Sequence, residues 1–461
     1  MADIVVQKFG GTSVDRDEHR RLAARKVMAV REAGMRPVVV VSAIGRRGAP
    51  YATDTLRDCL NGIDPSFTPN LREMDVMMAC GELISTAVMA VTLQSMGVPA
   101  VALSGGQAGI ETDTSFGSAR ILGVTPQAIL DAVERNEVPV VCGFQGVTRC
   151  GGLAPHGDIT TLGRGGSDTT ASALGAALHA ARVEIYTDVD GVKTADPDMV
   201  PNAATLDVCT YPELFEITHL GAQVVHPRAA EIAMDYGIPL WVKSTFSDHP
   251  GTCIVPEGGE PSPTQSRVTG ITHSGRGVFF RIQIDNEVHK PQIEQEVYRL
   301  MGRAGINMYM VSFSENSLSF AVNRDLYHRA QDLLDGMVVP IGSNPNNQPA
   351  SHFYIFKFAK GLDLAYSAQR PLLRPVESFI EVVDVPGEVF ENVTMVSVVA
   401  SGHRHTPGVM SAIFETLDAA GIPIIQVADS TMSISCLVPE ANLEQAVRLL
   451  HDAFGLSGTQ A

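Results

Sequence analysis

Two hydrophobic patterns alternate along the first 246 residues of the chain. Short β-branched runs, such as Pro-Val-Val-Val-Val-Ser at 37–42, are typical of buried strands, and longer segments with apolar residues three and four apart are typical of helices. Strands that alternate with helices predict an α/β fold with a mostly parallel sheet and helices on both of its faces. We expect strands at 4–7, 37–42, 98–103, 138–144, 182–187 and 238–243, and helices at 71–95, 126–136, 168–180 and 222–236.

The rest of the chain contains a linker and an internal repeat. Pro, Gly, Ser and Thr dominate 247–267, which predicts a linker. After it, Gly305-Ile306 and Ser317-Leu318-Ser319 recur 116 residues later as Gly421-Ile422 and Ser433-Ile434-Ser435. With a strand before each copy, each unit reads β-α-β-β-α-β, a ferredoxin-like module. The predicted domains are 1–246, a linker at 247–267, a first module at 268–338, an insertion at 339–393 with strand-like content that could extend a sheet or cover an edge, and a second module at 394–461.

Composition narrows the class of protein. A length of 461 residues predicts two or three domains, and the formal net charge of −17 argues against nucleic-acid or anionic-membrane partners. The seven cysteines form no CxxC pair, which favours reduced thiols. Neither a signal-peptide pattern nor an uninterrupted run of 18 apolar residues occurs, so we expect a cytoplasmic protein without a membrane span.

The first strand ends in a group of residues suited to phosphate binding. Lys8-Phe9-Gly10-Gly11-Thr12-Ser13-Val14 combines a flexible cation with two glycines whose backbone N–H groups can approach an anion. Thr12 and Ser13 can also cap a helix that begins near 15–18. Taken alone, the pattern is more often a plain turn. Two further glycine and acid clusters, at 163–170 and 186–192, strengthen the phosphate interpretation.

The motifs together resemble those of the aspartate kinases, members of the amino-acid kinase superfamily. The resemblance rests on KFGGTSV at 8–14, SAIG at 42–45, Thr53-Asp54, CGELIS at 80–85, GRGGSDTT at 163–170, YTDVDGV at 186–192 and GAQVVHPRA at 221–229. It implies a monofunctional bacterial type with an amino-acid kinase fold and two C-terminal ACT modules. The implied reaction transfers the γ-phosphoryl group of ATP, with Mg²⁺, to the side-chain carboxylate of L-aspartate. The product, 4-phospho-L-aspartate, leads toward lysine and diaminopimelate, threonine and methionine.

This chemistry calls for cations and N–H donors, because a carboxylate nucleophile is already ionised near neutral pH. Lys8 suits the terminal phosphates of ATP and the amides of Gly10 and Gly11 suit a phosphate, while Arg164 suits the α-carboxylate of aspartate. These four are the catalytic candidates. The resemblance further implies ATP contacts at Phe9, Thr187, Asp188, Lys193 and Asp198, and substrate contacts at Ser42, Thr53, Glu82 and Ser167.

We expect the phosphates to supply most of the ligands of Mg²⁺, so we assign no protein residue as a metal ligand. Asp168 and Asp190 could hold the ion through water.

Three positions depart from the family pattern. Lys193, Asp198 and Gln223 stand where most aspartate kinases have tyrosine, arginine and lysine, so ATP binding is expected to weaken unless Lys193 recovers part of it. The departures leave open a catalytically weak, amino-acid-binding regulatory relative. A kinase for another amino-acid carboxylate, such as glutamate, is a further alternative.

The two modules imply regulation and assembly. ACT modules of the family bind end-product amino acids and pair edge to edge, so lysine, threonine or diaminopimelate is a candidate effector and a homo-oligomer is expected. A duplicated module that serves as a dimerisation platform without a ligand is the alternative.

Overall fold

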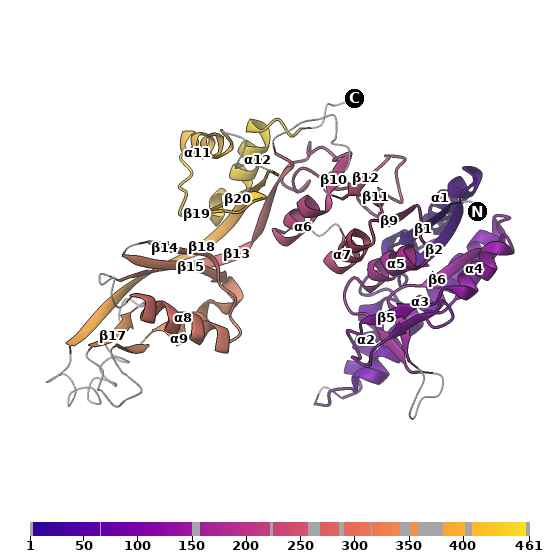
Figure 1. Ribbon diagram of the computed structural model, residues 1–461, viewed down its shortest axis with the longest axis horizontal. Coiled ribbons are helices and arrows are strands. Elements are labelled where there is room, and N and C mark those ends of the chain that lie inside the picture. Colours follow the sequence, from indigo (N-terminus) through magenta and orange to yellow (C-terminus); the bar gives the residue numbers. More distant parts are fainter. Residues whose placement is uncertain are drawn as a thin grey trace. The chain divides into compact units, whose positions relative to one another are not determined.

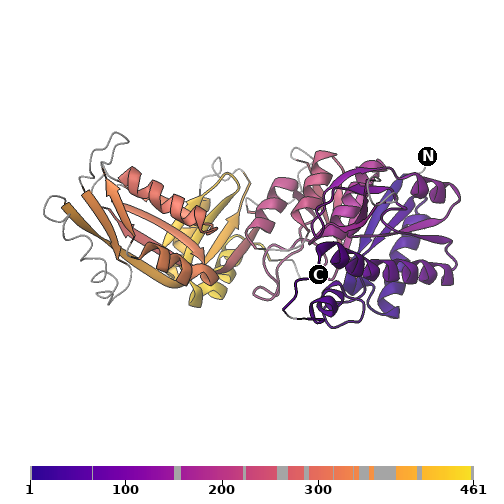
Figure 2. The same ribbon diagram turned by 90° about the horizontal axis from the view of Figure 1, so that it is seen from below.

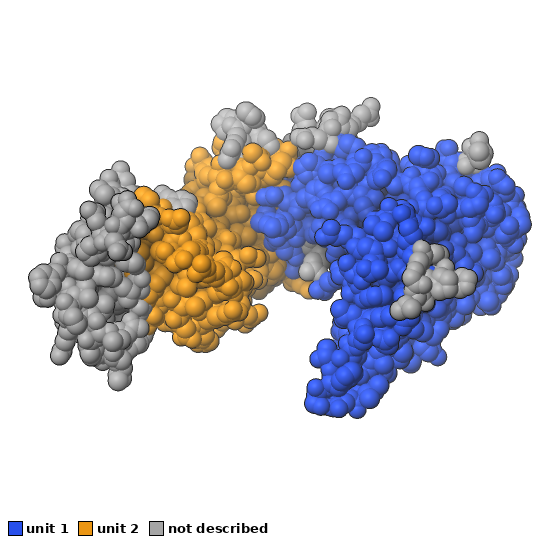
Figure 3. Space-filling view, turned by 60° about the horizontal axis from the view of Figure 1, so that its bottom comes forward, with its two compact units in different colours: residues 1–197, 202–269, 456–461 blue, residues 198–201, 270–455 orange. Residues whose placement is uncertain are grey.

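The structure is a computed structural model that describes residues 3–64, 66–149, 157–221, 225–256, 268–284, 290–314, 316–335, 337–341, 352–357, 381–401 and 408–457. The chain divides into two compact units, which Figure 3 colours separately. The first unit comprises residues 1–197, 202–269 and 456–461, and the second comprises 198–201 and 270–455.

An eight-stranded sheet forms the centre of the first unit. Its strand order is β10-β12-β11-β9-β1-β2-β6-β3, and the neighbours from β11 to β3 are all parallel. The strands are β1 (Ile4–Phe9), β2 (Arg36–Val41), β3 (Ala100–Leu103), β6 (Val138–Cys142), β9 (Arg182–Thr187), β10 (Val208–Thr210), β11 (Leu240–Ser244) and β12 (Thr252–Val255). The predicted parallel sheet is therefore confirmed, and the carboxyl ends of its parallel strands meet along one edge.

Helices cover both faces of this sheet (Figures 1 and 2). They are α1 (Asp17–Glu32), α2 (Thr53–Asn61), α3 (Leu71–Ser95), α4 (Gln127–Glu134), α5 (Gly166–Ala177), α6 (Tyr211–His219) and α7 (Pro227–Asp235). Val27 of α1 and Met89 of α3 pack with Phe9 and Val39 in one buried cluster. The next side chain along β1 from Phe9, that of Lys8, reaches α5 on the other face.

A second, four-stranded sheet was not predicted from the sequence. Its order is β5-β4-β7-β8, formed by β4 (Ile110–Thr112), β5 (Ile121–Val124), β7 (Gln145–Thr148) and β8 (Ile159–Thr161). The fully buried Asp75 of α3 accepts hydrogen bonds from the N–H of Gly117 and from the N–H and hydroxyl of Thr161. These bonds anchor α3 to the small sheet.

Among the described residues, α3 is the one helix long and apolar enough to cross a membrane by length and composition alone. In the fold, 56% of its most apolar window is buried, and its inner face carries Asp75 and Glu82. Such burial is typical of the core helix of a folded domain.

The second unit confirms the internal repeat. Its elements are β13 (Gly270–Gln283), α8 (Lys290–Arg303), β14 (Tyr309–Ser314), β15 (Ser317–Asn323), α9 (Tyr327–Leu334), β16 (Val338–Ile341), β17 (His352–Lys357), β18 (Glu381–Val399), α11 (Val409–Ala419), β19 (Gln426–Asp429), β20 (Ser433–Pro439) and α12 (Leu443–Ala453). Gly305 and Gly421 both adopt a φ of +67°, and β15 and β20 both lead through a short 3₁₀ turn into a helix. The two copies therefore share the same local structure.

The predicted boundaries differ from the structure in two places. Residues 252–255 form β12 of the first unit's sheet, so the predicted linker at 247–267 is wrong there, and 257–267 lie outside the described residues. The start of β13, at 270–273, pairs with 396–399 of β18, whereas 277–283 pair with β15. One strand therefore serves both modules, since β13 and β18 are neighbours in the single sheet that both repeats share.

Part of the predicted insertion at 339–393 is strand. Within it, β17 pairs with β16 and with the first part of β18, so these residues extend the sheet.

Candidate active site

The end of β1 places Lys8 in an ion pair. Its Nζ lies 2.6 Å from Oδ1 of Asp168, which is in the first turn of α5, and the two side chains are only 12% and 15% exposed. Burial limits screening by water, so the carboxylate holds the ammonium group at the strand end. The sequence suggested Asp168 only as a water-mediated metal contact and gave no sign of this pairing.

The loop after Lys8 presents fewer free amides than expected. The N–H of Gly10 donates to the carbonyl of Tyr186 at 3.3 Å, so the expectation that this amide is free for phosphate is wrong. No hydrogen bond from the N–H of Gly11 is found among the described residues. A Cβ on Gly11 would lie 2.6 Å from the carbonyl oxygen of Gly45, so only glycine fits there. Gly11 is therefore the better candidate donor.

The predicted helix cap is also wrong. Helix α1 begins at Asp17 after Arg16, with no side-chain cap. The Ser13 hydroxyl instead forms a buried 2.7 Å hydrogen bond with the hydroxyl of Thr245, which follows β11. Ser13 thus fastens the loop to the neighbouring strand end.

Glu82 is a buried carboxylate with one unsatisfied oxygen. Its Oε1 accepts a 3.0 Å hydrogen bond from the N–H of Ala43, and its buried Oε2 has no hydrogen-bond partner. Burial raises the pKa of Glu82 to about 8. The neighbouring Gly81 lets α3 approach the loop after β2, because a Cβ there would lie 2.7 Å from the carbonyl oxygen of Tyr51. This carboxylate is suited to accept an ammonium group.

Arg164 lies on the turn between β8 and α5. Its side chain is exposed, and no acidic partner for it is found in the described part of the chain. The flanking Gly163 and Gly165 have φ values of +75° and +70°, a region that glycine adopts without strain. Gly165 also leaves room for the His226 ring, because a Cβ there would lie 2.0 Å from its Cγ. The exposed guanidinium is accessible to a carboxylate.

The other predicted substrate residues lie at ends of the same elements. Ser42 follows β2, and its N–H donates to the carbonyl of Phe9 at 3.1 Å. Thr53 begins α2. Ser167 is buried in the first turn of α5, and its Cβ would be 2.7 Å from a Cβ on Gly143. Ser42 and Ser167 therefore lie at the carboxyl edge of the sheet, beside the ends of β2 and β6.

The predicted nucleotide residues follow β9. The Thr187 hydroxyl donates to Asp188 at 3.2 Å, and Asp188 forms an exposed 2.7 Å ion pair with Arg46. Lys193 donates from Nζ to the Thr205 hydroxyl at 2.7 Å.

Two further positions bear on the nucleotide by their sequence alone. Asp198 belongs to the second unit, and Gln223 lies outside the described residues. The described residues contain no group of three or more His, Cys, Asp or Glu that could hold a metal ion.

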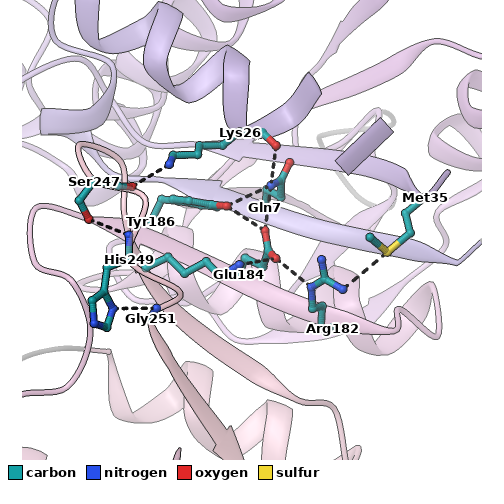
Figure 4. Close-up of polar contacts among 10 residues, drawn as sticks. Gln7, Lys26, Met35, Arg182, Glu184, Tyr186, Ser247, His249 and Gly251 are labelled. Carbon is teal, nitrogen blue, oxygen red and sulfur yellow. Dashed lines mark hydrogen bonds and ion pairs between the residues drawn. The ribbon is translucent and has the colours of Figure 1, made fainter. Parts of the chain in front are cut away.

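A second buried carboxylate, Glu184, lies on the α1 side of the sheet (Figure 4). Its Oε2 accepts hydrogen bonds from Gln7 (2.8 Å) and the Tyr186 hydroxyl (3.1 Å). Its Oε1 contacts Arg182 Nε at 2.8 Å and Lys243 Nζ at 3.1 Å. Burial would raise the pKa of Glu184, but the charges of Lys243 and Arg182 and the hydrogen bonds outweigh it, so the pKa is lowered.

The Glu184 cluster stabilises the active-site loop through Tyr186. Tyr186 stacks on Phe9, with ring centroids 4.7 Å apart, and its carbonyl receives the N–H of Gly10. The cluster therefore fixes β9 beside β1 where the loop begins. The cluster was not predicted from the sequence, although polar residues at every second position of a buried strand are a usable signal.

Comparison with known proteins shows the family of the chain. A profile of the amino acid kinase family matches residues 3–244, and a profile of the ACT domain matches 396–454. Aspartokinase 1 of Bacillus subtilis is 36% identical over 457 residues, covering 98% of this chain and 99% of the relative. The aspartokinase of Mycolicibacterium smegmatis is 35% identical over 463 residues, covering 99% and 97%.

Solved structures show the same fold. The aspartate kinase of Clostridium acetobutylicum has a TM-score of 0.70 at 21% identity, covering 98% of this chain and 100% of that one. Aspartokinase III of E. coli, in complex with aspartate and ADP, has a TM-score of 0.62 at 23% identity, covering 98% and 99%. The fold and the strand-end site define an amino acid kinase. Within that class, this chain belongs to the aspartokinase family, ATP-dependent kinases that phosphorylate a carboxylate.

Proposed function

We propose that the chain transfers the γ-phosphoryl group of ATP to the side-chain carboxylate of L-aspartate through the residues at the carboxyl edge of the sheet. The observation that carries the proposal is Glu82, a buried carboxylate whose Oε2 has no partner. A buried unpaired acceptor is costly, and an ammonium group would satisfy it. Near-full-length similarity to aspartokinases supports aspartate as the substrate.

The three groups of aspartate would then have separate partners. Glu82 receives its ammonium group, and the exposed Arg164 receives its α-carboxylate as a bidentate pair. Ser42, Thr53 and Ser167 would complete the substrate site between these two partners. The side-chain carboxylate needs no base, because it is ionised near neutral pH.

Lys8 would stabilise the charge of the moving phosphoryl group. Its ammonium group is held by Asp168, so it needs little reorganisation during transfer. The N–H of Gly11 adds a donor, whereas Gly10 acts through its bond to Tyr186. Phe9, Thr187, Asp188 and Lys193 form the nucleotide side, with Asp198 kept as a sequence-based candidate. Mg²⁺, when bound with ATP, would neutralise phosphate charge.

The ACT modules would bind an amino-acid effector in a cytoplasmic homo-oligomer. The matched ACT profile supports an effector, and E. coli aspartokinase III has been solved in complex with lysine and aspartate. Lysine, threonine and diaminopimelate are the candidates.

A coupled ADP assay with aspartate, glutamate and N-acetylaspartate tests the substrate. We expect turnover with aspartate alone, because N-acetylaspartate lacks the ammonium group that Glu82 requires. Turnover of glutamate without aspartate, or equal use of N-acetylaspartate, would contradict the proposal. Assays repeated with each candidate effector identify the regulator as the one that changes the aspartate rate.

A further inference from the structure

The turn that carries Arg164 has little stiffness of its own. Gly163 and Gly165 flank Arg164, and glycine has more backbone freedom than any other residue. The N–H of Gly166 donates to the carbonyl of Gly163 at 3.0 Å, and the N–H of Thr169 donates to the carbonyl of Gly165 at 3.0 Å. These bonds tie the turn to the start of α5 but leave its sides open. A guanidinium that must hold a carboxylate in one place therefore needs support from outside the turn.

The side chain of His226 supplies a contact from outside. A Cβ on Gly165 would lie 2.0 Å from Cγ and 2.2 Å from Cδ2 of His226, so the ring occupies the space directly beside this glycine. On the other side of Arg164, the atom nearest to a Cβ on Gly163 would be Oγ of Ser118, at 3.2 Å. The ring of His226 is therefore the closer neighbour, and it limits movement of the turn on the side of Gly165.

The helix that follows His226 is itself fastened to the same turn. Helix α7 begins with Pro227 at its first position and packs beside α5 (Figure 1). In its first turn, Arg228 donates from Nη1 to the carbonyl oxygens of Ala119 at 3.2 Å and Leu162 at 3.5 Å. Leu162 is the last residue before the glycine turn. The start of α7 therefore contacts the turn at both of its ends.

Other common roles of a histidine do not account for His226. Its side chain forms no capping hydrogen bond with α7. Its Nδ1 is buried and has no hydrogen-bond partner in the part of the chain that the structure describes. Packing against Gly165 therefore sets the position of the ring, rather than a hydrogen bond at Nδ1. A planar ring with two side-chain torsions is well suited to such a contact.

We propose that His226 is a positioning residue for the amino-acid substrate. Its ring fixes Gly165 and, through it, the guanidinium of Arg164. The inference rests on the proposed function, in which Arg164 receives the α-carboxylate of aspartate. This carboxylate takes no part in phosphoryl transfer, so its partner binds the substrate and the transition state about equally. Loss of the ring should therefore raise the KM for aspartate and leave kcat nearly unchanged.

Three substitutions of His226 separate shape from polarity. His226→Ala should raise the KM for aspartate about 10-fold, with kcat and the KM for ATP within about twofold. His226→Phe keeps a ring beside Gly165 and should stay within about threefold of wild type, whereas His226→Asn keeps a polar group but no ring and should resemble His226→Ala. The control His219→Ala, at an exposed histidine in the last turn of α6, should leave the KM unchanged. Recovery by Asn but not by Phe would overturn the proposal.

A double-mutant cycle tests whether His226 acts through Arg164. Arg164→Ala should raise the KM for aspartate, and adding His226→Ala should then change it no further, because the two residues act as one unit. Additive effects, or a normal KM for His226→Ala alone, would overturn the inference and leave the proposed function intact. A normal KM for Arg164→Ala would contradict the proposed function and the inference together. If His226→Ala does not fold, His226→Asn takes its place in the cycle.

Discussion

Two buried glutamates in the same unit have opposite surroundings. Glu184 is 1% exposed and receives donors on both oxygens from Gln7, Tyr186, Arg182 and Lys243. Glu82 is 2% exposed and has a single donor, the N–H of Ala43. The pKa of the first is lowered and that of the second is raised to about 8.

The difference separates a carboxylate that supports structure from one that awaits a ligand. A fully satisfied buried carboxylate joins strands, as Glu184 joins β1, β9 and β11. A half-satisfied one costs folding free energy and persists where a ligand completes it. Glu82 lies near the loop after β2 at the carboxyl edge, whereas Glu184 lies on a face of the sheet under α1.

Two lysines extend the comparison and give the largest expected effect. Lys8→Ala should lower kcat about 1000-fold, about 4 kcal/mol in the barrier, because the cation at the strand end is lost. The matched variant Lys243→Ala, beside Glu184, should keep kcat within about threefold but lower the thermal midpoint. Steady-state kinetics with ATP and aspartate measures both. A Lys8→Ala variant with normal kcat would show that the phosphoryl group moves elsewhere.

Removal of the satisfied carboxylate should destabilise the fold. Glu184→Gln leaves Arg182 and Lys243 without an anion, at a cost of about 3 kcal/mol in unfolding free energy at pH 7. Because its folded pKa is lowered, the contribution of Glu184 is present above its unfolded pKa near 4.5 and is lost as pH falls through the folded value. Urea unfolding at pH 7 and pH 3.5 measures the unfolding free energy that Glu184→Gln removes. An equal loss at both pH values would contradict this prediction.

Removal of the unsatisfied carboxylate should weaken the binding of aspartate instead. Glu82→Gln should raise the KM for aspartate about 100-fold, about 2.7 kcal/mol, because a neutral amide cannot form an ion pair with an ammonium group. The dissociation constant for ATP should stay within about twofold. Calorimetric titration with aspartate and with ATP measures the two affinities separately. Equal losses of affinity for both ligands would contradict the role of Glu82 as the partner of the aspartate ammonium group.

The same substitution should stabilise the unliganded protein at alkaline pH. A glutamate whose folded pKa is raised to about 8 loses stability as pH rises from its unfolded pKa toward that value. Glu82→Gln removes this loss, so at pH 8 the variant should be more stable than wild type by about 4 kcal/mol, and near pH 4 the two should be alike. Thermal scans at both pH values compare the midpoints of wild type and Glu82→Gln. A higher midpoint for wild type at pH 8 would contradict the prediction.

The sequence predicted the central fold well where apolar patterns were long. The strand at 182–187 and the helix at 71–95 have the predicted bounds, because burial on both faces of the strand and the long, mainly apolar run of the helix leave a clear pattern. The small sheet was missed, since strands of three or four residues such as Ile110–Thr112 carry no resolvable periodicity. The shared use of β13 was missed because strand pairing over 120 residues leaves no local sign.

The candidate site was predicted in its residues more than in its contacts. Lys8, Glu82 and Arg164 were named from residue chemistry and family resemblance, but neither reveals what an unliganded side chain touches. The pairing of Lys8 with Asp168 and the engaged amide of Gly10 depend on how α5 and β9 lie beside β1. Such tertiary contacts follow from packing, which the order of residues does not display.

Proton release on aspartate binding tests the central contrast directly. With a pKa of about 8, Glu82 is about nine-tenths protonated at pH 7, and an incoming ammonium group requires its ionised form. Calorimetry in buffers of different ionisation enthalpy should therefore show release of about one proton per aspartate bound by wild type and by Glu184→Gln, and none by Glu82→Gln. Binding by wild type without proton release would contradict the account.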